Sequence, residues 1–282
     1  MQNPHSSQKL ATSSSTPTTT SGRVLEAYIP AQRGAIPFDR NYYRDLEPSS
    51  GGSRRSADVI VPLMLDILRP TSVVDVGCGL GSWLAAFQAN GVEDVLGIDL
   101  DNVDRDLLLI PAERFLPANL RQPLKLDRTF DLALCCEVAG FLPSENAAVL
   151  VDSLVHLSAV VAFSAPIPLQ GGPNAINEQW PDYWTALFAE RGYVMIDPIR
   201  RVIWDRADVK WWFAQNLLLF IREDLIASNP LWNKERERAK EGPLSLVHPR
   251  LHTERETLDT SLKRALLALP RLFATAIRRR VT

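Results

Sequence analysis

Short, continuously apolar runs that alternate with helical segments are the feature that most restricts how this chain can fold. Leu132–Cys136 and Val160–Ser164 are two such runs, and Ala147–Leu157 between them carries apolar side chains at helical spacing. A strand that is apolar on both faces needs helices on both sides, as in a parallel sheet. The pattern therefore predicts an α/β fold with a doubly wound sheet.

Further segments extend this alternation in both directions along the chain. The expected helices are Ser56–Leu68, Ser82–Asn90 and Tyr183–Arg191. The expected strands are Val73–Val76, Val95–Ile98 and, late in the chain, a hairpin of Ile199–Trp204 and Leu217–Ile221. The sheet is therefore expected to be complete by Ile221.

The chain divides into three parts by composition. Residues 1–22 are rich in Ser and Thr and bury too little apolar surface to offset the entropy of ordering, so they are predicted to be a disordered tail. Residues 23–224 form the predicted α/β domain. Residues 225–282 are predicted to be a helical, basic appendage, and a chain that ends near Asp224 is expected to fold without it.

Bulk properties argue against several classes of function. A formal net charge of −2 gives no general attraction to nucleic acid. Cys78, Cys135 and Cys136 lack the spacing of a zinc or redox motif, so no metal is expected. No apolar run reaches the roughly 20 residues that span a bilayer, and no secretory signal is recognisable. A cytoplasmic protein is expected.

The strongest motif is a glycine-rich turn between a strand and a helix, VVDVGCGLGSW at residues 73–83. Its glycines follow the pattern G-x-G-x-G, whereas the dinucleotide fingerprint would need a glycine in place of Ser82. Asp75 would repel a pyrophosphate but suits the ammonium group of an amino-acid-bearing cofactor. Asp99, after the next strand, is placed to accept hydrogen bonds from ribose hydroxyls. These features favour S-adenosylmethionine over NAD, with a nicotinamide-dependent oxidoreductase as the alternative.

Several motifs together resemble those of class I S-adenosylmethionine-dependent methyltransferases. The glycine turn resembles their motif I, and it is followed in order by Gly97-Ile98-Asp99, Phe130-Asp131-Leu132 and Asn177-Glu178-Gln179-Trp180. The last segment resembles a bacterial subgroup associated with sugar, glycan and other secondary or cell-surface biosynthesis. The resemblance covers residues 38–224. It implies a Rossmann-like, mostly parallel seven-stranded sheet and methyl transfer to an oxygen or nitrogen of a small molecule or glycan precursor.

The resemblance also implies which residues bind the cofactor. They are Asp75, Gly77, Gly79 and Gly81 at the methionine end, Asp99 at the ribose, Leu100 beside the adenine, Asn119 and Leu120 near the adenine amino group, and Glu137 at the mouth of the site. Asn119 stands where such enzymes usually carry Asp, so it offers a carbonyl acceptor without charge.

The chain departs from the family pattern where a general base is expected. Gly140 and Phe141 replace a Glu-His pair, and Ala175 replaces a histidine. Proton removal would then fall to a carboxylate, for which Glu178 is the catalytic candidate and Glu137 a second choice. The departures also leave open a catalytically silent cofactor-binding or scaffold module.

Aromatic residues follow Glu178 in the sequence. Trp180, Tyr183 and Trp184 could form a wall that stacks against a sugar or ring, or they could pack in the core.

The C-terminal segment is amphipathic and basic. Leucines and alanines recur at helical spacing over 258–269, and Arg271 and Arg278–Arg280 follow after Pro270. Such a helix can dock on the domain or on a second subunit. It can also lie peripherally on an anionic membrane surface such as the inner membrane face.

The membrane interpretation predicts that the full chain co-sediments with vesicles containing anionic lipid but not with neutral vesicles. Salt should release it, because screening weakens the attraction between the arginines and the headgroups. A variant with Arg278–Arg280 changed to Gln is the matched test and should stay in the supernatant. Equal sedimentation with neutral vesicles would contradict the prediction.

Overall fold

The computed structural model describes residues 52–171 and 175–253. The predicted disordered tail at 1–22 and the predicted basic helix at 258–280 lie outside these residues. Among the described helices, none is both long and apolar enough to cross a membrane.

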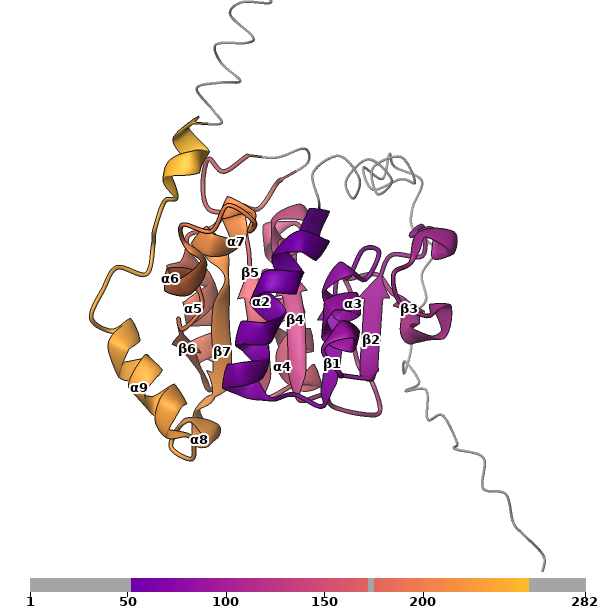
Figure 1. The fold of residues 1–282 in the computed structure, drawn as a ribbon, viewed down its shortest axis with the longest axis horizontal. Coiled ribbons are helices and arrows are strands. Elements are labelled where there is room, and N and C mark those ends of the chain that lie inside the picture. Colours follow the sequence, from indigo (N-terminus) through magenta and orange to yellow (C-terminus); the bar gives the residue numbers. More distant parts are fainter. Residues whose placement is uncertain (1–51, 172–174, 254–282) are drawn as a thin grey trace, which may run out of the picture.

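The described residues form a seven-stranded sheet with the strand order β3-β2-β1-β4-β5-β7-β6 (Figure 1). The strands are β1 (Ser72–Val76), β2 (Asp94–Asp99), β3 (Phe115–Pro117), β4 (Leu132–Cys136), β5 (Val160–Ser164), β6 (Tyr193–Ile196) and β7 (Leu218–Arg222). Pairing is parallel except that β7 runs antiparallel to both β5 and β6. The predicted Rossmann-like, mostly parallel fold is confirmed.

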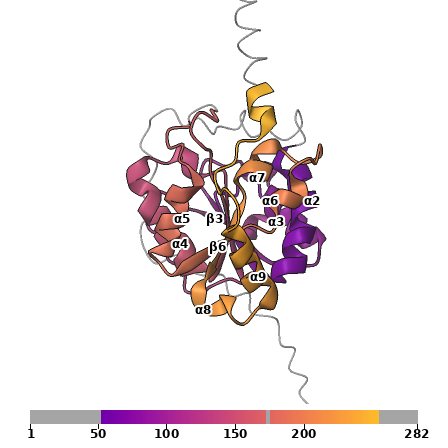
Figure 2. The same ribbon diagram turned by 90° about the vertical axis from the view of Figure 1, so that its left-hand side faces the viewer.

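Helices cover both faces of this sheet (Figure 2). One layer contains α2 (Gly52–Leu68), α3 (Ser82–Ala89), α6 (Arg200–Ile203) and α7 (Trp211–Asn216), and the other contains α4 (Ala147–Leu157) and α5 (Pro181–Ala189). Successive strand residues point to opposite layers. Val73 therefore packs in the core under α2 and α3, and Val74 packs in the core under α4 and α5. Burial on both faces accounts for the continuously apolar strands that the sequence displays.

One strand of the predicted C-terminal hairpin is confirmed and the other is wrong. β7 lies where it was expected, but Ile199–Trp204 contains helix α6, and the partner of β7 is β6 at Tyr193–Ile196. Ile199 and Ile203 are buried while Val202 is 58% exposed, so the buried residues are spaced by one helical turn. In this short segment, apolar content alone did not distinguish a helix from a strand.

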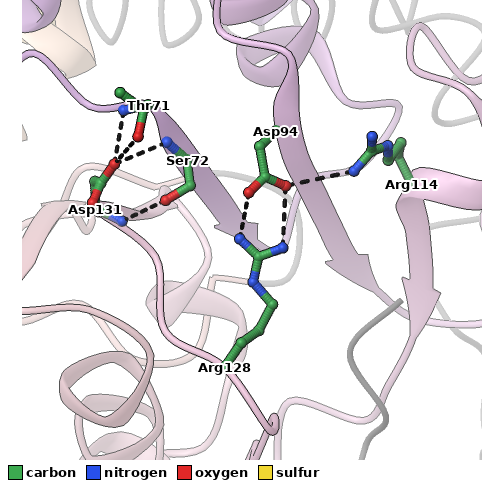
Figure 3. A network of polar contacts seen from close by, with 6 residues as sticks. All are labelled: Thr71, Ser72, Asp94, Arg114, Arg128 and Asp131. Carbon is green, nitrogen blue, oxygen red and sulfur yellow. Dashed lines mark hydrogen bonds and ion pairs between the residues drawn. The ribbon is translucent and has the colours of Figure 1, made fainter. Parts of the chain in front are cut away.

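Polar contacts tie together the amino-terminal ends of the central strands (Figure 3). Asp131, just before β4, accepts hydrogen bonds from the backbone and hydroxyl of Thr71 at 2.8 and 2.6 Å and from the backbone of Ser72 at 3.1 Å. Asp94, at the start of β2, forms ion pairs with Arg114 and Arg128. These contacts lie at the end of the sheet opposite the glycine turn, where they fix the register of β1, β2 and β4.

The described part of the C-terminal segment packs against the domain. It includes α8 (Glu223–Ile226) and α9 (Pro230–Ala239), and α9 lies beside the edge strand β6. The indole N–H of Trp232 donates to the carbonyl of Ile67 at 3.2 Å. The carbonyl of Leu244 accepts from Arg200 at 3.1 Å, and Leu251 is buried. Residues 225–253 therefore contribute packing that the sequence-based expectation for a chain ending at Asp224 did not include.

We accordingly expect a chain that ends at Asp224 to be destabilised. Its melting temperature should fall by roughly 10 °C or more, because several buried side chains and their hydrogen-bond partners are lost together. A chain that ends at Thr253 keeps all of these contacts and is the matched control. Equal melting temperatures for the two truncated chains, measured by circular dichroism, would show that residues 225–253 are dispensable.

Candidate cofactor and active site

The glycine turn connects β1 to α3 and has the backbone conformation that its glycines permit. Gly77, Gly79 and Gly81 have φ angles of 84°, 53° and 83°, which L-residues with a Cβ rarely adopt. The N–H of Gly77 donates to the carbonyl of Ile98 at 2.7 Å, which fastens the turn to the neighbouring strand β2. The turn therefore lies at the carboxyl end of the sheet, where open α/β folds bind their ligands.

Gly77 is also required by its surroundings. A Cβ at this position would lie 2.2 Å from Cγ2 of Val138, a residue that follows β4. The turn and the β4 loop thus approach as closely as glycine allows.

Asp75 is a buried carboxylate directly before this turn. Its Oδ2 atom is inaccessible to solvent and has no hydrogen-bond partner in the described part of the chain. Burial, with a smaller contribution from the charge of Asp99, raises the pKa of Asp75 from 3.8 to about 8. A buried acceptor without a partner is uncommon in native proteins, and an ammonium group is the kind of ligand that would satisfy it.

Asp99, the last residue of β2, is buried and held by backbone donors. Its Oδ2 accepts from the N–H of Gly79 at 2.7 Å, and its Oδ1 accepts from the N–H of Leu100 at 2.6 Å. Burial raises its pKa, although these hydrogen bonds partly oppose the effect. Each carboxylate oxygen keeps a second acceptor position, which suits a pair of ribose hydroxyls.

The segment predicted to contact adenine lies beside Asp99. The N–H of Ala118 donates to the carbonyl of Asp99 at 2.8 Å, which holds the segment after β3 against the end of β2. The side-chain oxygen of Asn119 accepts from the backbone of Arg121 at 3.1 Å, and Leu120 packs in the core. Leu100 is partly exposed.

Glu137 follows β4 and has an unusual backbone conformation, with a φ of 58°. Its Oε1 accepts from Asn216 Nδ2 at 3.0 Å, and its Oε2 accepts from Gln170 Nε2 at 3.2 Å. Desolvation by the surrounding protein raises the pKa of Glu137 from 4.5 to about 7, although these hydrogen bonds act in the opposite direction. A non-glycine residue held at positive φ is often found at functional sites.

Glu178 has a different environment from Glu137. Its Oε2 accepts from the N–H of Leu169 at 2.8 Å, and its Oε1 accepts from the N–H of Gly171 at 2.5 Å. Both oxygens therefore hold the loop that follows β5. Burial moves the pKa of Glu137 toward neutrality, whereas the two oxygens of Glu178 are occupied by backbone donors of this loop.

The three predicted substrate aromatics are not equivalent. Trp184 is 2% exposed, and its ring lies 5.0 Å from that of Phe163 between centroids, inside the core. Tyr183 is half-buried and packs edge-on against Trp184 at 5.1 Å. Trp180, just before α5, is 42% exposed. Of the three, only Trp180 presents a large part of its ring to solvent.

Packing explains Gly140, one of the departures from the family pattern. A Cβ there would lie 2.3 Å from Cγ of Pro166. The carbonyl of Gly140 also accepts from the backbone N–H groups of Ile176 and Asn177 at 2.8 and 3.0 Å. A glutamate in this position would displace the loop after β5.

Sequence reasoning missed the amides that surround Glu137, which are Gln170, Gln215 and Asn216. They come from the loop after β5 and from the end of α7, and no motif marks them. Only the pairing of Phe163 with Leu218, which places the start of β7 beside the end of β5, reveals that they lie close to Glu137. Within residues 52–171 and 175–253, no His, Cys, Asp and Glu side chains form a group of three that could hold a metal ion.

A family model described as a methyltransferase domain matches residues 49–216. The chain belongs to this family, and the match confirms its resemblance to class I S-adenosylmethionine-dependent methyltransferases. No curated protein matches the chain in sequence.

The fold is also similar to solved structures. DesVI from Streptomyces venezuelae has a TM-score of 0.50 and 14% identity over 65% of this chain and 98% of its own. CalS10, an amino pentose methyltransferase from Micromonospora echinaspora, has a TM-score of 0.47 and 18% identity over 64% and 96%. An O-methyltransferase family protein from Burkholderia thailandensis has a TM-score of 0.42 and 12% identity over 66% of this chain and 63% of its own, which is under two thirds of that protein.

The raised pKa of Asp75 predicts a pH-dependent stability. The folded protein keeps a proton that the unfolded chain loses above about pH 4, so the free energy of unfolding should fall as the pH rises from about 4 to about 8. Asp75→Asn should flatten this dependence and raise the melting temperature at about pH 8. The same variant should bind S-adenosylhomocysteine roughly 10- to 100-fold more weakly, because an amide cannot neutralise an ammonium group.

Asp127→Asn, at an exposed position before β4, is the matched control and should change neither property. A parallel loss of stability and affinity in Asp75→Asn would instead assign Asp75 a purely structural role.

Proposed function

We propose that this chain is a methyltransferase that uses S-adenosylmethionine to methylate an oxygen or nitrogen of a small molecule or glycan precursor. The observation that carries the proposal is the buried carboxylate of Asp75 beside the glycine turn, whose Oδ2 atom has no hydrogen-bond partner among the described residues. A carboxylate in that position fits the ammonium group of the cofactor, and it would repel the pyrophosphate of NAD.

The proposal assigns a role to each of the cofactor-binding residues expected from the sequence. Asp75, Gly77, Gly79 and Gly81 hold the methionine portion, and Asp99 accepts from the ribose hydroxyls. Leu100, Asn119 and Leu120 line the adenine end. Asn119 Oδ1 already accepts from Arg121, so one acceptor position remains for the adenine amino group.

Methyl transfer makes modest demands on the protein. S-adenosylmethionine supplies a methyl group that its sulfonium sulfur already activates. The protein then orients the acceptor and removes its proton. Glu137 suits proton removal, because a carboxylate with a pKa of about 7 exists in both protonation states near neutral pH.

Of the three predicted aromatic residues, Trp180 is the one most available to an acceptor. It precedes α5, in the segment that leaves the carboxyl end of β5, and its exposed ring can stack against the apolar face of a sugar or another ring. Tyr183 contributes to the same segment, whereas Trp184 supports it from the core.

The experiment begins with the cofactor. Calorimetry should show binding of S-adenosylmethionine and S-adenosylhomocysteine, and NAD should not compete with either. NAD binding without S-adenosylhomocysteine binding would refute the proposal. Isotope-labelled methyl groups should then pass from the cofactor into components of a small-molecule extract. Cofactor binding without any transfer would favour the catalytically silent module.

The same assay separates the two candidate carboxylates. Glu137→Gln should lower the transfer rate about 100-fold, the typical contribution of a general base, and should change S-adenosylhomocysteine affinity much less. The wild-type rate should rise with pH through about 7, because Glu137 accepts a proton only when ionised. Glu178→Gln keeps an acceptor oxygen for the loop after β5 and should have a much smaller effect. The opposite ranking would return the catalytic role to Glu178.

A further inference from the structure

A continuous set of amide side chains surrounds Glu137. Asn216 Nδ2 donates both to Glu137 Oε1 at 3.0 Å and to Gln170 Oε1 at 2.9 Å. Gln215 Nε2 donates to Asn216 Oδ1 and to Gln170 Oε1, each at 2.9 Å. Asn216 and Gln215 are almost completely buried, at 3% and 0% exposed. These hydrogen bonds are therefore shielded from competition with water.

The amide hydrogens of this set have little freedom to rearrange. An amide nitrogen carries two hydrogens, and those of Asn216 and Gln215 are all engaged. Gln170 Oε1 accepts from both neighbours and from the backbone of Ile167 at 3.2 Å, which leaves its nitrogen to face Glu137. The set thus presents one N–H donor to each carboxylate oxygen.

Residues beyond the family match hold the set from behind. The N–H of His248 donates to Gln215 Oε1 at 2.8 Å. Arg200, a buried residue paired with Asp197, donates from Nη1 to the carbonyls of Gln215 at 2.9 Å and Leu244 at 3.1 Å. The backbone of His248 therefore holds the side chain of Gln215, whereas the backbone of Gln215 is held by Arg200, which the carbonyl of Leu244 helps to orient.

We propose that Asn216 and Gln170 are positioning residues that orient the carboxylate of Glu137, and that Gln215, held by the backbone of His248, keeps Asn216 in its donating orientation. This inference rests on the proposed role of Glu137 as the base. It goes further by assigning part of the catalytic apparatus to the C-terminal segment, outside residues 49–216 that match the family.

The arrangement has two consequences for Glu137. Because each oxygen receives a donor from the protein, a proton that Glu137 takes up must lie on the side away from the amides. The donors also stabilise the ionised carboxylate and so oppose the effect of burial. The titratable groups nearest along β4 are the thiols of Cys135 and Cys136, whose pKa values burial and nearby carboxylates raise well above their ordinary value. These thiols stay neutral while Glu137 titrates.

The test follows the titration of Glu137 directly, without an acceptor. Infrared spectra of the full chain are recorded against the same protein carrying Glu137→Gln, so that the difference isolates the Glu137 carboxyl band over a range of pH. Asn216→Leu and Gln170→Met remove a donor while roughly preserving shape. Each should raise the pH of half-titration by roughly one to two units, the amount expected for a lost hydrogen bond to a charged group. Gln215→Met should act in the same direction with a smaller shift.

Gln179→Met is the matched control. Its side-chain amide donates to Asn177 at 3.1 Å and does not contact the set, so the titration of Glu137 should not change. Binding of S-adenosylhomocysteine verifies that each variant is folded. If Asn216→Leu fails this criterion, Gln170→Met decides the outcome, because the side chain of Gln170 is partly exposed.

An unchanged titration in the folded donor variants, or an equal shift in Gln179→Met, would overturn the positioning role. Failure of the proposed function has a separate signature. Methyl transfer by Glu137→Gln at the wild-type rate would refute the base, even where the titration shifts support the amide set.

Discussion

The hydrogen bond from the N–H of Gly79 to the carboxylate of Asp99 joins the turn after β1 to the end of β2. This contact depends on three features together: positive φ in the turn, a short distance between the two strand ends, and a buried acid. Leu100 donates to the other oxygen of the same carboxylate, which fixes its plane. The parallel sheet, its two helical layers and the loops at its carboxyl end are arranged around this contact. The polar contacts at the amino end hold the same strands in register from the far side (Figure 3).

Three acids with raised pKa values lie at the carboxyl end of this sheet, and they differ in their hydrogen-bond partners. Asp99 is held by backbone donors, Glu137 by side-chain amides, and Asp75 has an oxygen with no partner within residues 52–171 and 175–253. Desolvating a carboxylate is unfavourable unless it is paired, so burying these acids lowers the stability of the folded protein. Such cost is common where a ligand later supplies the missing charge.

The sequence was sufficient for the mostly parallel α/β fold and for the position of the glycine turn. Apolar runs such as Leu132–Cys136 and the glycine turn are local signals, and each lies where its pattern predicted. Local signals failed where tertiary contacts decide the outcome. Ile199–Trp204 is too short for its period to be read, and the burial of Trp184 depends on Phe163 from a different strand. The amides of Gln215 and Asn216 lie close to Glu137 because β7 pairs antiparallel with β5. No residue pattern in the sequence indicates this pairing.

The insertion of β7 also affects the order in which the site forms during synthesis. β7 lies between β5 and β6 in the sheet but comes last of the seven strands in the chain, so it is synthesised after every strand that carries the glycine turn, Asp99 and Glu137. A chain emerging from the ribosome can assemble β1 to β4 before Gln215 and Asn216 exist, since domains form progressively during synthesis. The glycine turn and Asp99 can therefore be in place before the amides that hold Glu137. With Glu137 as the proposed base, methyl transfer would begin only after Gln215 and Asn216 have been synthesised.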